Sequence, residues 1–147
     1  MPTSPQHTFT MAELQPWYGD GRAKTDAVKL KASTVFPLGS ALYELAASAK
    51  TFAPYVAGAT DGTGTSGAPV PTFLLKRACA TDASGNISFS NLAGSSDLGQ
   101  TSLTAAAYYK GAFNLLDLPQ TGAGSLDTAG KNAMGRQLEQ GKILDLL

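Results

Sequence analysis

The residues that could carry out acid–base or nucleophilic chemistry are few and far apart in this sequence. His7 is the only histidine and Cys79 the only cysteine among the 147 residues. A catalytic histidine must be held within hydrogen-bond reach of its nucleophile, but His7 lies in a proline-containing, non-periodic segment. Cys79 lies in a strand-like run over residues 74–80, where we expect a small buried side chain. The sequence therefore predicts no nucleophilic triad, and we expect that the protein is not an enzyme.

The spacing of the possible ligands and carboxylates also predicts neither a metal site nor a catalytic carboxylate pair. One histidine and one cysteine in different segments do not supply the converging ligands of a metal site, so no metal or other cofactor is expected. A glycosidase-like pair needs two carboxylates about 5 to 10 Å apart. Aspartates stand at four predicted turns, where the side chain binds nearby backbone amides: Asp61, Asp82, Asp97 and Asp117. This turn-forming role explains all four, and nothing in the sequence selects a pair.

The composition excludes several classes of partner. Eleven basic and eleven acidic residues give a formal net charge of zero, whereas a protein that binds the nucleic-acid backbone needs a concentrated positive excess. No apolar run approaches the roughly 18 residues of a membrane helix. The N-terminus also lacks the basic and apolar stretches of a signal peptide. We therefore expect neither a nucleic acid nor a membrane as partner.

The chain divides into an N-terminal arm, residues 1–32, and a single β-rich domain, residues 33–147. The arm contains prolines and turn residues and has too little apolar surface to offset the entropy of ordering. Trp17 and Tyr18 are its large aromatics. They suit an interface, because aromatic anchors bury a large area, but Trp is also highly buried on average, so packing onto their own domain is an equal alternative. At the end of the arm, residues 28–33 alternate as in a half-buried strand.

The sequence of the domain predicts strands over most of its length. Residues 41–46 and 51–56 form a hairpin, with Pro54 favouring a sheet edge because it lacks an N–H. Further strands are expected over residues 71–80, 86–90 and 101–110, with Gly111 ending the last of them. A turn is expected at residues 82–86. The glycine-rich stretch 58–71 predicts a mobile surface loop, since no Gly-Lys-Ser/Thr follows it as in a phosphate loop.

One helix is expected near the C-terminus, over residues 125–140. Its apolar stripe has the three- and four-residue spacing of an amphipathic helix and consists of Leu126, Ala129, Ala133, Met134 and Leu138. Ser125 is the predicted cap and Gly141 the stop. Gly130 weakens the helix by about 1 kcal/mol relative to alanine, so the helix depends on packing. A final strand over residues 142–147 completes a mainly β chain with one short helix.

The order of several short motifs resembles the lambda-type bacteriophage head decoration proteins, a family of capsid cements. The motifs are Gly39-Ser-Ala-Leu42, Lys50-Thr-Phe-Ala-Pro54, Thr60-Asp61-Gly62, an apolar strand running from Phe73 to an acidic turn at Asp82, Tyr108-Tyr109-Lys110-Gly111-Ala-Phe113, and a helical stretch, a glycine and an apolar end from Asn132 to Leu147. Each motif is weak alone, and their shared order carries the resemblance, which covers roughly residues 31–147. The chain departs from the smallest members by extra residues at 64–71 and 90–100 and by an arm rich in aromatics.

The resemblance implies a β-clip-like fold and a structural role on a virion. It implies a homotrimer on the outer surface of the expanded head, bound to the major capsid protein and stabilising the shell. The arm would add as a strand to the capsid protein, which places the candidate capsid-binding residues at Phe9, Trp17, Tyr18, Val28 and Leu30. A virion-surface carbohydrate-binding or adhesion module is the alternative; it would need exposed aromatics on a rigid face. A small hydrolase is disfavoured by the position of His7.

Overall fold

The computed structural model describes residues 13–16, 23–90, 96–139 and 144–146, and side chains within 13–16, 23–89 and 102–134. Strands make up 41% of the chain and helical residues 12%, which confirms the prediction of a mainly β fold. The elements in chain order are β1 (Lys24–Leu30), β2 (Val35–Phe36), β3 (Ala41–Leu45), β4 (Ser48–Pro54), η1 (Thr65–Gly67), β5 (Pro71–Leu75), β6 (Cys79–Thr81), β7 (Ile87–Ser90), β8 (Ser96–Ser102), β9 (Ala105–Phe113), η2 (Leu115–Asp117), α1 (Thr128–Glu139) and β10 (Leu144–Leu146).

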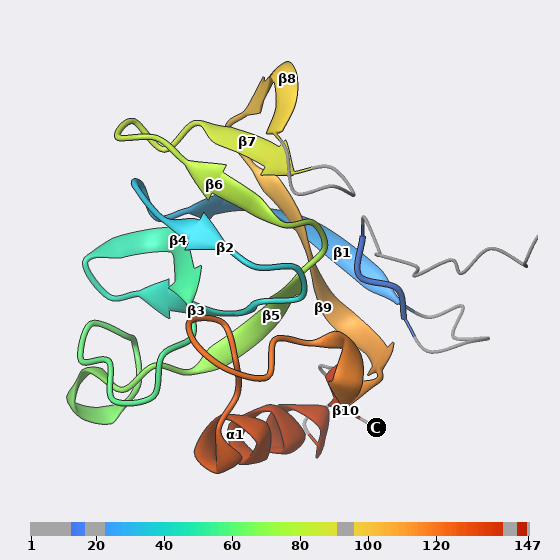
Figure 1. Cartoon of the computed structure of the whole chain (residues 1–147). Coiled ribbons are helices and arrows are strands. Elements are labelled where there is room, and N and C mark those ends of the chain that lie inside the picture. The colour runs from blue at the N-terminus through green and yellow to red at the C-terminus, as the bar shows by residue number, and fades with distance from the viewer. Residues whose placement is uncertain (1–12, 17–22, 91–95, 140–143, 147) are drawn as a thin grey trace, which may run out of the picture.

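The larger of two sheets closes into a ring. Its strand order is β1-β4-β3-β5-β9-β10, and β1 also pairs with β9. Most pairs are antiparallel, but β1 runs parallel to β4 and β10 runs parallel to β9. The smaller sheet has the order β2-β6-β7-β8. In Figure 1 it lies at the top, α1 lies at the bottom, and the ring strands run between them.

The folded body begins before residue 33, so the predicted boundary after residue 32 is corrected. β1 pairs with β9 over Lys24–Val28 and with β4 at Lys29 and Leu30. Closing the ring needs a strand between β4 and β9, and this segment supplies it. The alternation seen over residues 28–33 is therefore a real strand signal, although the strand starts earlier and belongs to the domain.

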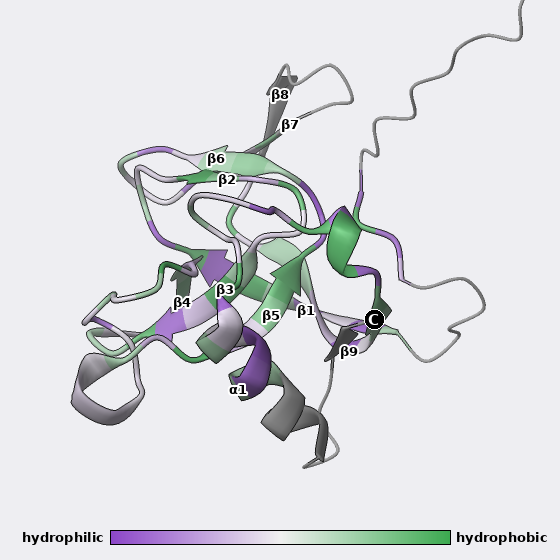
Figure 2. Cartoon of the chain, turned by 60° about the horizontal axis from the view of Figure 1, so that its bottom comes forward, coloured by the Kyte–Doolittle hydropathy of each residue, from purple (hydrophilic) through white to green (hydrophobic). Residues whose placement is uncertain are grey.

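The predicted hairpin is confirmed. β3 and β4 pair antiparallel, with Leu42 opposite Pro54. The pairing of β4 with β1 covers only Thr51 and Phe52, so Pro54 lies where β4 has β3 on one side alone. β5 lies between β3 and β9 and is coloured as hydrophobic in Figure 2, as expected for a strand covered on both faces.

Alternate side chains of the ring strands enter two separate apolar clusters. The inner cluster takes residues from all five ring strands and from the small sheet, and consists of Val28, Leu30, Phe36, Leu42, Phe52, Leu75, Cys79, Ile87, Ala105 and Ala107. The outer cluster lies on the opposite face and consists of Leu14, Ala41, Tyr43, Ala53, Tyr55, Leu74, Tyr108, Phe113, Leu118 and Met134. The period-2 geometry of a strand explains why neighbours such as Leu74 and Leu75 belong to different clusters.

Gly111 does not end its strand, contrary to the sequence prediction. β9 continues through it to Phe113. The φ of Gly111 is 136°, and a Cβ there would lie 3.0 Å from both Ala23 Cβ and Phe113 Cε2. Side chains five residues apart on a regular strand face opposite sides, yet the rings of Tyr108 and Phe113 pack 4.8 Å apart in the outer cluster. Gly111 thus shifts the alternation, a conformation that favours glycine.

The single strand predicted over residues 71–80 is two strands in different sheets. β5 ends at Leu75 and β6 starts at Cys79. At the break, the N–H of Lys76 donates to Ala106 O at 3.1 Å. The segment between the two strands carries the chain from the ring into the small sheet. The apolar pattern of residues 71–80 does not indicate this change of sheet.

The helix starts at Thr128 and its cap is Asp127, which corrects the predicted start at residue 125 with Ser125 as cap. Asp127 Oδ1 accepts a hydrogen bond from Gly130 N at 2.8 Å, the N-cap to N3 contact. Ser125 Oγ instead donates to Gly122 O. Met134 of the predicted stripe is buried, whereas Ala129 is exposed and the side chain of Leu138 lies outside the described residues.

The glycine-rich loop is internally hydrogen-bonded. Gly62 N donates to Gly67 O and Gly64 N to Ala68 O, both at 2.8 Å. Gly67 has a φ of 80° and would place a Cβ against Thr60 O. The glycines therefore permit close backbone approach, and the loop is more organised than the sequence prediction of a mobile segment.

Candidate functional site

The structure describes two of the five predicted capsid-binding residues, Val28 and Leu30. Phe9, Trp17 and Tyr18 lie outside the described residues. Val28 and Leu30 are 4% and 3% exposed and belong to the inner cluster. Their apolar surface already stabilises the ring, so their assignment as contacts of an arm is wrong. The two positions alternate as an arm strand would, but the partners are β4 and β9 of the same chain.

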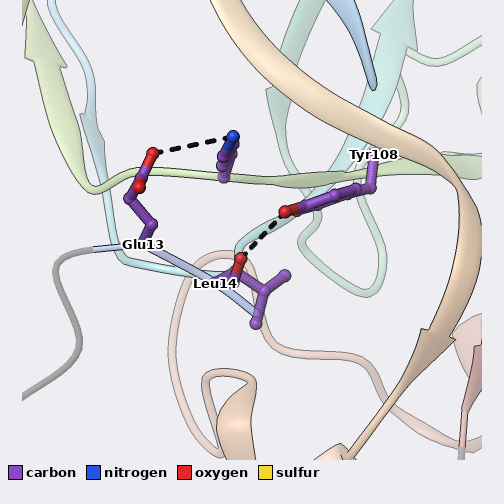
Figure 3. A network of polar contacts seen from close by, with 4 residues as sticks. Glu13, Leu14 and Tyr108 are labelled. Atoms are coloured by element: carbon purple, nitrogen blue, oxygen red, sulfur yellow. Dashed lines mark hydrogen bonds and ion pairs between the residues drawn. The ribbon is translucent and has the colours of Figure 1, made fainter. Parts of the chain in front are cut away.

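An anchor formed by Glu13, Leu14, Lys76 and Tyr108 fixes the N-terminal segment to the body (Figure 3). The Leu14 side chain is fully buried in the outer cluster. Leu14 N donates to Lys76 O at 2.7 Å, and the Tyr108 hydroxyl donates to Leu14 O at 3.1 Å. Both backbone polar groups of Leu14 are therefore satisfied, as burial demands.

Charged groups complete the anchor. Lys76 Nζ lies 3.7 Å from Glu13 Oε2 and 5.9 Å from the centre of the Tyr108 ring. Burial raises the pKa of the Tyr108 hydroxyl, and the negative charge of Glu13 adds to the rise. The Tyr108 side chain therefore stays neutral, and its hydroxyl donates a hydrogen bond to Leu14 O. The partly exposed ion pair itself contributes little, about 0 to 1 kcal/mol.

Little in the sequence points to this anchor. Glu13 and Leu14 lie inside the segment assigned to an arm, and no motif marks Lys76 or Arg77. In the structure Lys76 forms an ion pair with Glu13, and the Arg77 guanidinium lies 4.8 Å from the centre of the Phe89 ring, a cation–π contact. A lone leucine between polar residues was the sole hint.

The other perturbed groups have structural roles. The Tyr43 hydroxyl donates to Asp61 Oδ1 at 2.6 Å, and the Tyr55 hydroxyl donates to Asp127 Oδ1 at 2.9 Å. Burial raises the pKa of Tyr55 to about 12, with the Asp127 carboxylate contributing. The same causes raise the pKa of Tyr43 well above its usual value. These bonds tie the glycine-rich loop and the start of α1 to the sheet.

Cys79 and the turn aspartate behave as the sequence predicts. Cys79 is 2% exposed, and burial raises the pKa of its thiol to about 12 despite the charge of Arg77, so it is a thiol and a poor nucleophile at neutral pH. Asp82 Oδ1 accepts hydrogen bonds from Ser84 N and Asn86 N. Bonds to Asn86 hold the pKa of Asp82 below its usual value, and the residue forms a turn.

The described residues offer no cluster of metal ligands. Within the described ranges, no group of three or more His, Cys, Asp or Glu side chains is arranged to bind a metal. His7 and the side chain of Asp97 lie outside these ranges. No helix in the described part of the chain is long and apolar enough to cross a membrane.

Exposed apolar side chains are the next feature of the described surface. The large apolar side chains that are most exposed in the described part are Val35 at 72%, Leu103 at 70% and Leu116 at 79%. They lie on three different segments of the chain.

Comparisons with protein-family models, with curated proteins and with solved structures give no match.

Proposed function

We propose that the protein is a bacteriophage head decoration protein. It binds the outer surface of the expanded head as a homotrimer, contacts the major capsid protein and stabilises the shell, with the β-clip-like fold of the family it resembles. It acts on the virion without nucleic acid, membrane or cofactor as partner. The proposal rests first on the order of short motifs between Gly39 and Leu147, which matches that family's order.

The structural observation that supports the proposal is the anchor. It fixes Glu13 and Leu14 to a closed ring and so gives the proposed arm, the twelve residues before Glu13, a fixed point of attachment. A fixed point of attachment raises the effective concentration of an arm at a partner next to the body. Strand addition suits such a segment, because main-chain hydrogen bonds supply affinity and alternate side chains fill pockets.

Aromatic residues flank the anchor in the sequence on both sides. Phe9 precedes it by a few residues, and Trp17 and Tyr18 follow it. Buried aromatics are frequent hot spots, and truncating one typically costs about 2 kcal/mol or more of binding energy. With Val28 and Leu30 assigned to the ring interior, these three aromatics are the remaining candidate contacts of the proposed arm.

Removing residues 1–11 tests the arm. The shortened protein keeps the anchor and β1, so we expect an unchanged thermal midpoint and lost co-sedimentation with purified expanded capsids. Cutting at residue 31 is unsuitable, because it removes β1 and opens the ring. The variant Leu116→Ala is a control, since it removes an exposed apolar side chain of the body. Undiminished capsid binding by the shortened protein would exclude residues 1–11, with Phe9, as the docking element and leave only Trp17 and Tyr18 as candidate contacts.

Heating shells with and without the full-length protein tests the stabilising role. A ligand that binds the expanded state preferentially stabilises that state by mass action. Decorated shells should therefore release their DNA at a higher temperature than bare shells. Equal release temperatures despite measured binding would remove the cement function, and absence of binding to any expanded capsid would remove the proposal as a whole.

A further inference from the structure

A hollow of about 420 Å³ lies on the outside of the ring between β1, the β3–β4 hairpin and the β6–β7 turn. Lys29 and Lys31 line it together with Thr51 and Ser84, and Leu45 and Leu103 supply its apolar part. Lys29 stands opposite Thr51 in the β1–β4 pairing. Lys29 reaches the hollow from β1 and Lys31 from the position directly after the end of that strand.

The positive charge of this hollow is unbalanced. Its lining, drawn entirely from described residues, contains two lysines and no carboxylate. Neither lysine forms an ion pair with another described residue. The nearest acidic residue along the turn, Asp82, is occupied by the amides of Ser84 and Asn86 and by the Asn86 side chain. The chain as a whole has no net charge, so this is a local feature.

The walls of the hollow are held rigidly. Lys31 N donates to Phe52 O at 2.8 Å, and Lys31 O accepts a hydrogen bond from Thr81 Oγ1 at 2.6 Å. The turn that carries Ser84 is held by the bonds to Asp82. A preformed site saves the cost of ordering its backbone on binding.

We propose that this hollow binds an acidic polypeptide segment, whose carboxylates pair with Lys29 and Lys31 and whose apolar side chains pack on Leu45 and Leu103. The apolar half distinguishes this ligand from a nucleic acid, since Leu103 is 70% exposed and needs an apolar partner to gain from burial. A nucleic-acid backbone would also require a wider basic surface than two lysines on a neutral chain.

The test uses the full-length protein and a blocked peptide of about ten residues that alternates glutamate with leucine, a length that suits an extended segment on a protein surface. Amide shifts in a ¹⁵N spectrum report where the peptide binds. We expect shifts at Lys29, Lys31, Thr51 and Ser84, and affinity that falls as salt is raised from about 50 to about 300 mM, because exposed charges are screened. The matching peptide with glutamine in place of glutamate should bind more weakly.

The double variant Lys29→Gln/Lys31→Gln should weaken binding about fivefold, the scale of two exposed ion pairs. The matched control, Lys24→Gln/Lys131→Gln, removes the same charge from two other exposed lysines and should leave binding unchanged. Because all four side chains are exposed, both variants should fold. The readout involves no capsid, so it succeeds or fails independently of the proposed function.

Three outcomes would overturn the proposal. Equal weakening in both double variants would show a response to net charge alone. Equal binding of the glutamine peptide would remove the role of carboxylates. Stronger displacement of the peptide by inorganic phosphate or by a short single-stranded oligonucleotide would assign the hollow to phosphate ligands in place of an acidic polypeptide.

Discussion

The two faces of the ring are stabilised in different ways. The inner cluster combines aliphatic and phenylalanine side chains with small residues such as Ala105, Ala107 and Cys79. A ring of five strands has a narrow interior, and small side chains fit it. The outer cluster contains three tyrosines, and each hydroxyl donates a hydrogen bond to a residue at least 18 positions away in the sequence. The inner face is therefore held by packing alone, whereas the outer face also fastens loops, helix and N-terminal segment to the sheet.

The largest effect is expected from a cavity in the inner cluster. Leu75 is fully buried on the central strand β5, so Leu75→Ala should lower the free energy of unfolding by about 2 to 5 kcal/mol. Urea denaturation followed by circular dichroism measures the loss. Leu116→Ala, at a residue 79% exposed, is the control and should change little. A loss below about 1 kcal/mol for Leu75→Ala would contradict a tightly packed ring interior.

A smaller loss in the free energy of unfolding is expected when the hydrogen bonds between the outer face and the start of α1 are removed. Asp127 accepts hydrogen bonds from both Gly130 N and the Tyr55 hydroxyl. Asp127→Ala removes the cap and leaves a buried hydroxyl unpaired, which together should cost about 2 kcal/mol. Asp127→Asn keeps an oxygen for the cap and should cost less. If the alanine and asparagine variants unfold at the same urea concentration, the carboxylate does not fasten the helix.

The two faces should also respond differently to alkaline pH. The pKa of Tyr55 rises from 10.0 to about 12 on the outer face, and that of Cys79 rises from 9.0 to about 12 on the inner face. Because each folded pKa exceeds the unfolded value, each contribution is complete below the unfolded pKa and is lost as the pH rises through the folded one. Stability should fall from about pH 9 upward, first through the thiol and then through the tyrosines.

Variants separate the two sources of this loss. Cys79→Ala should flatten the decline in the free energy of unfolding that starts at about pH 9. Tyr55→Phe should flatten only the part of that decline above about pH 10. Urea midpoints between about pH 8 and 11 measure both. Identical pH profiles for wild type and Tyr55→Phe would show that the outer hydroxyl does not titrate with unfolding.

The smallest effect is expected at the anchor's ion pair. Glu13 and Lys76 are partly exposed, with side-chain exposures of 42% and 32%. Glu13→Gln should therefore cost about 1 kcal/mol or less, whereas Leu14→Ala at the same anchor should cost about 2 kcal/mol or more because Leu14 is fully buried. Equal losses in the two variants would mean that charge, and not burial, holds the segment.

The anchor also shows where sequence reasoning fails for the candidate site. A single buried leucine between Glu13 and Gln15 has no periodic pattern around it, so composition assigns it to an arm. Val28 and Leu30 were correctly placed on a strand, but the pattern does not say which chain covers that strand. The same limit applies to Lys29 and Lys31, whose shared hollow needs Ser84 and Leu103 from distant parts of the chain.

The sequence by itself determined the mainly β class, the hairpin over β3 and β4, the turn at Asp82, the burial of Cys79 and the presence of one helix near the C-terminus. These features follow from local rules of alternation, turn chemistry and helical spacing. Only the tertiary structure decided that β1 closes a ring and that the run over residues 71–80 divides between two sheets. It also decided that Gly111 shifts a strand's alternation instead of ending it. The physical reason is that strand partners are chosen by long-range burial and hydrogen bonding, and a local pattern specifies one face of a strand but not what lies against it.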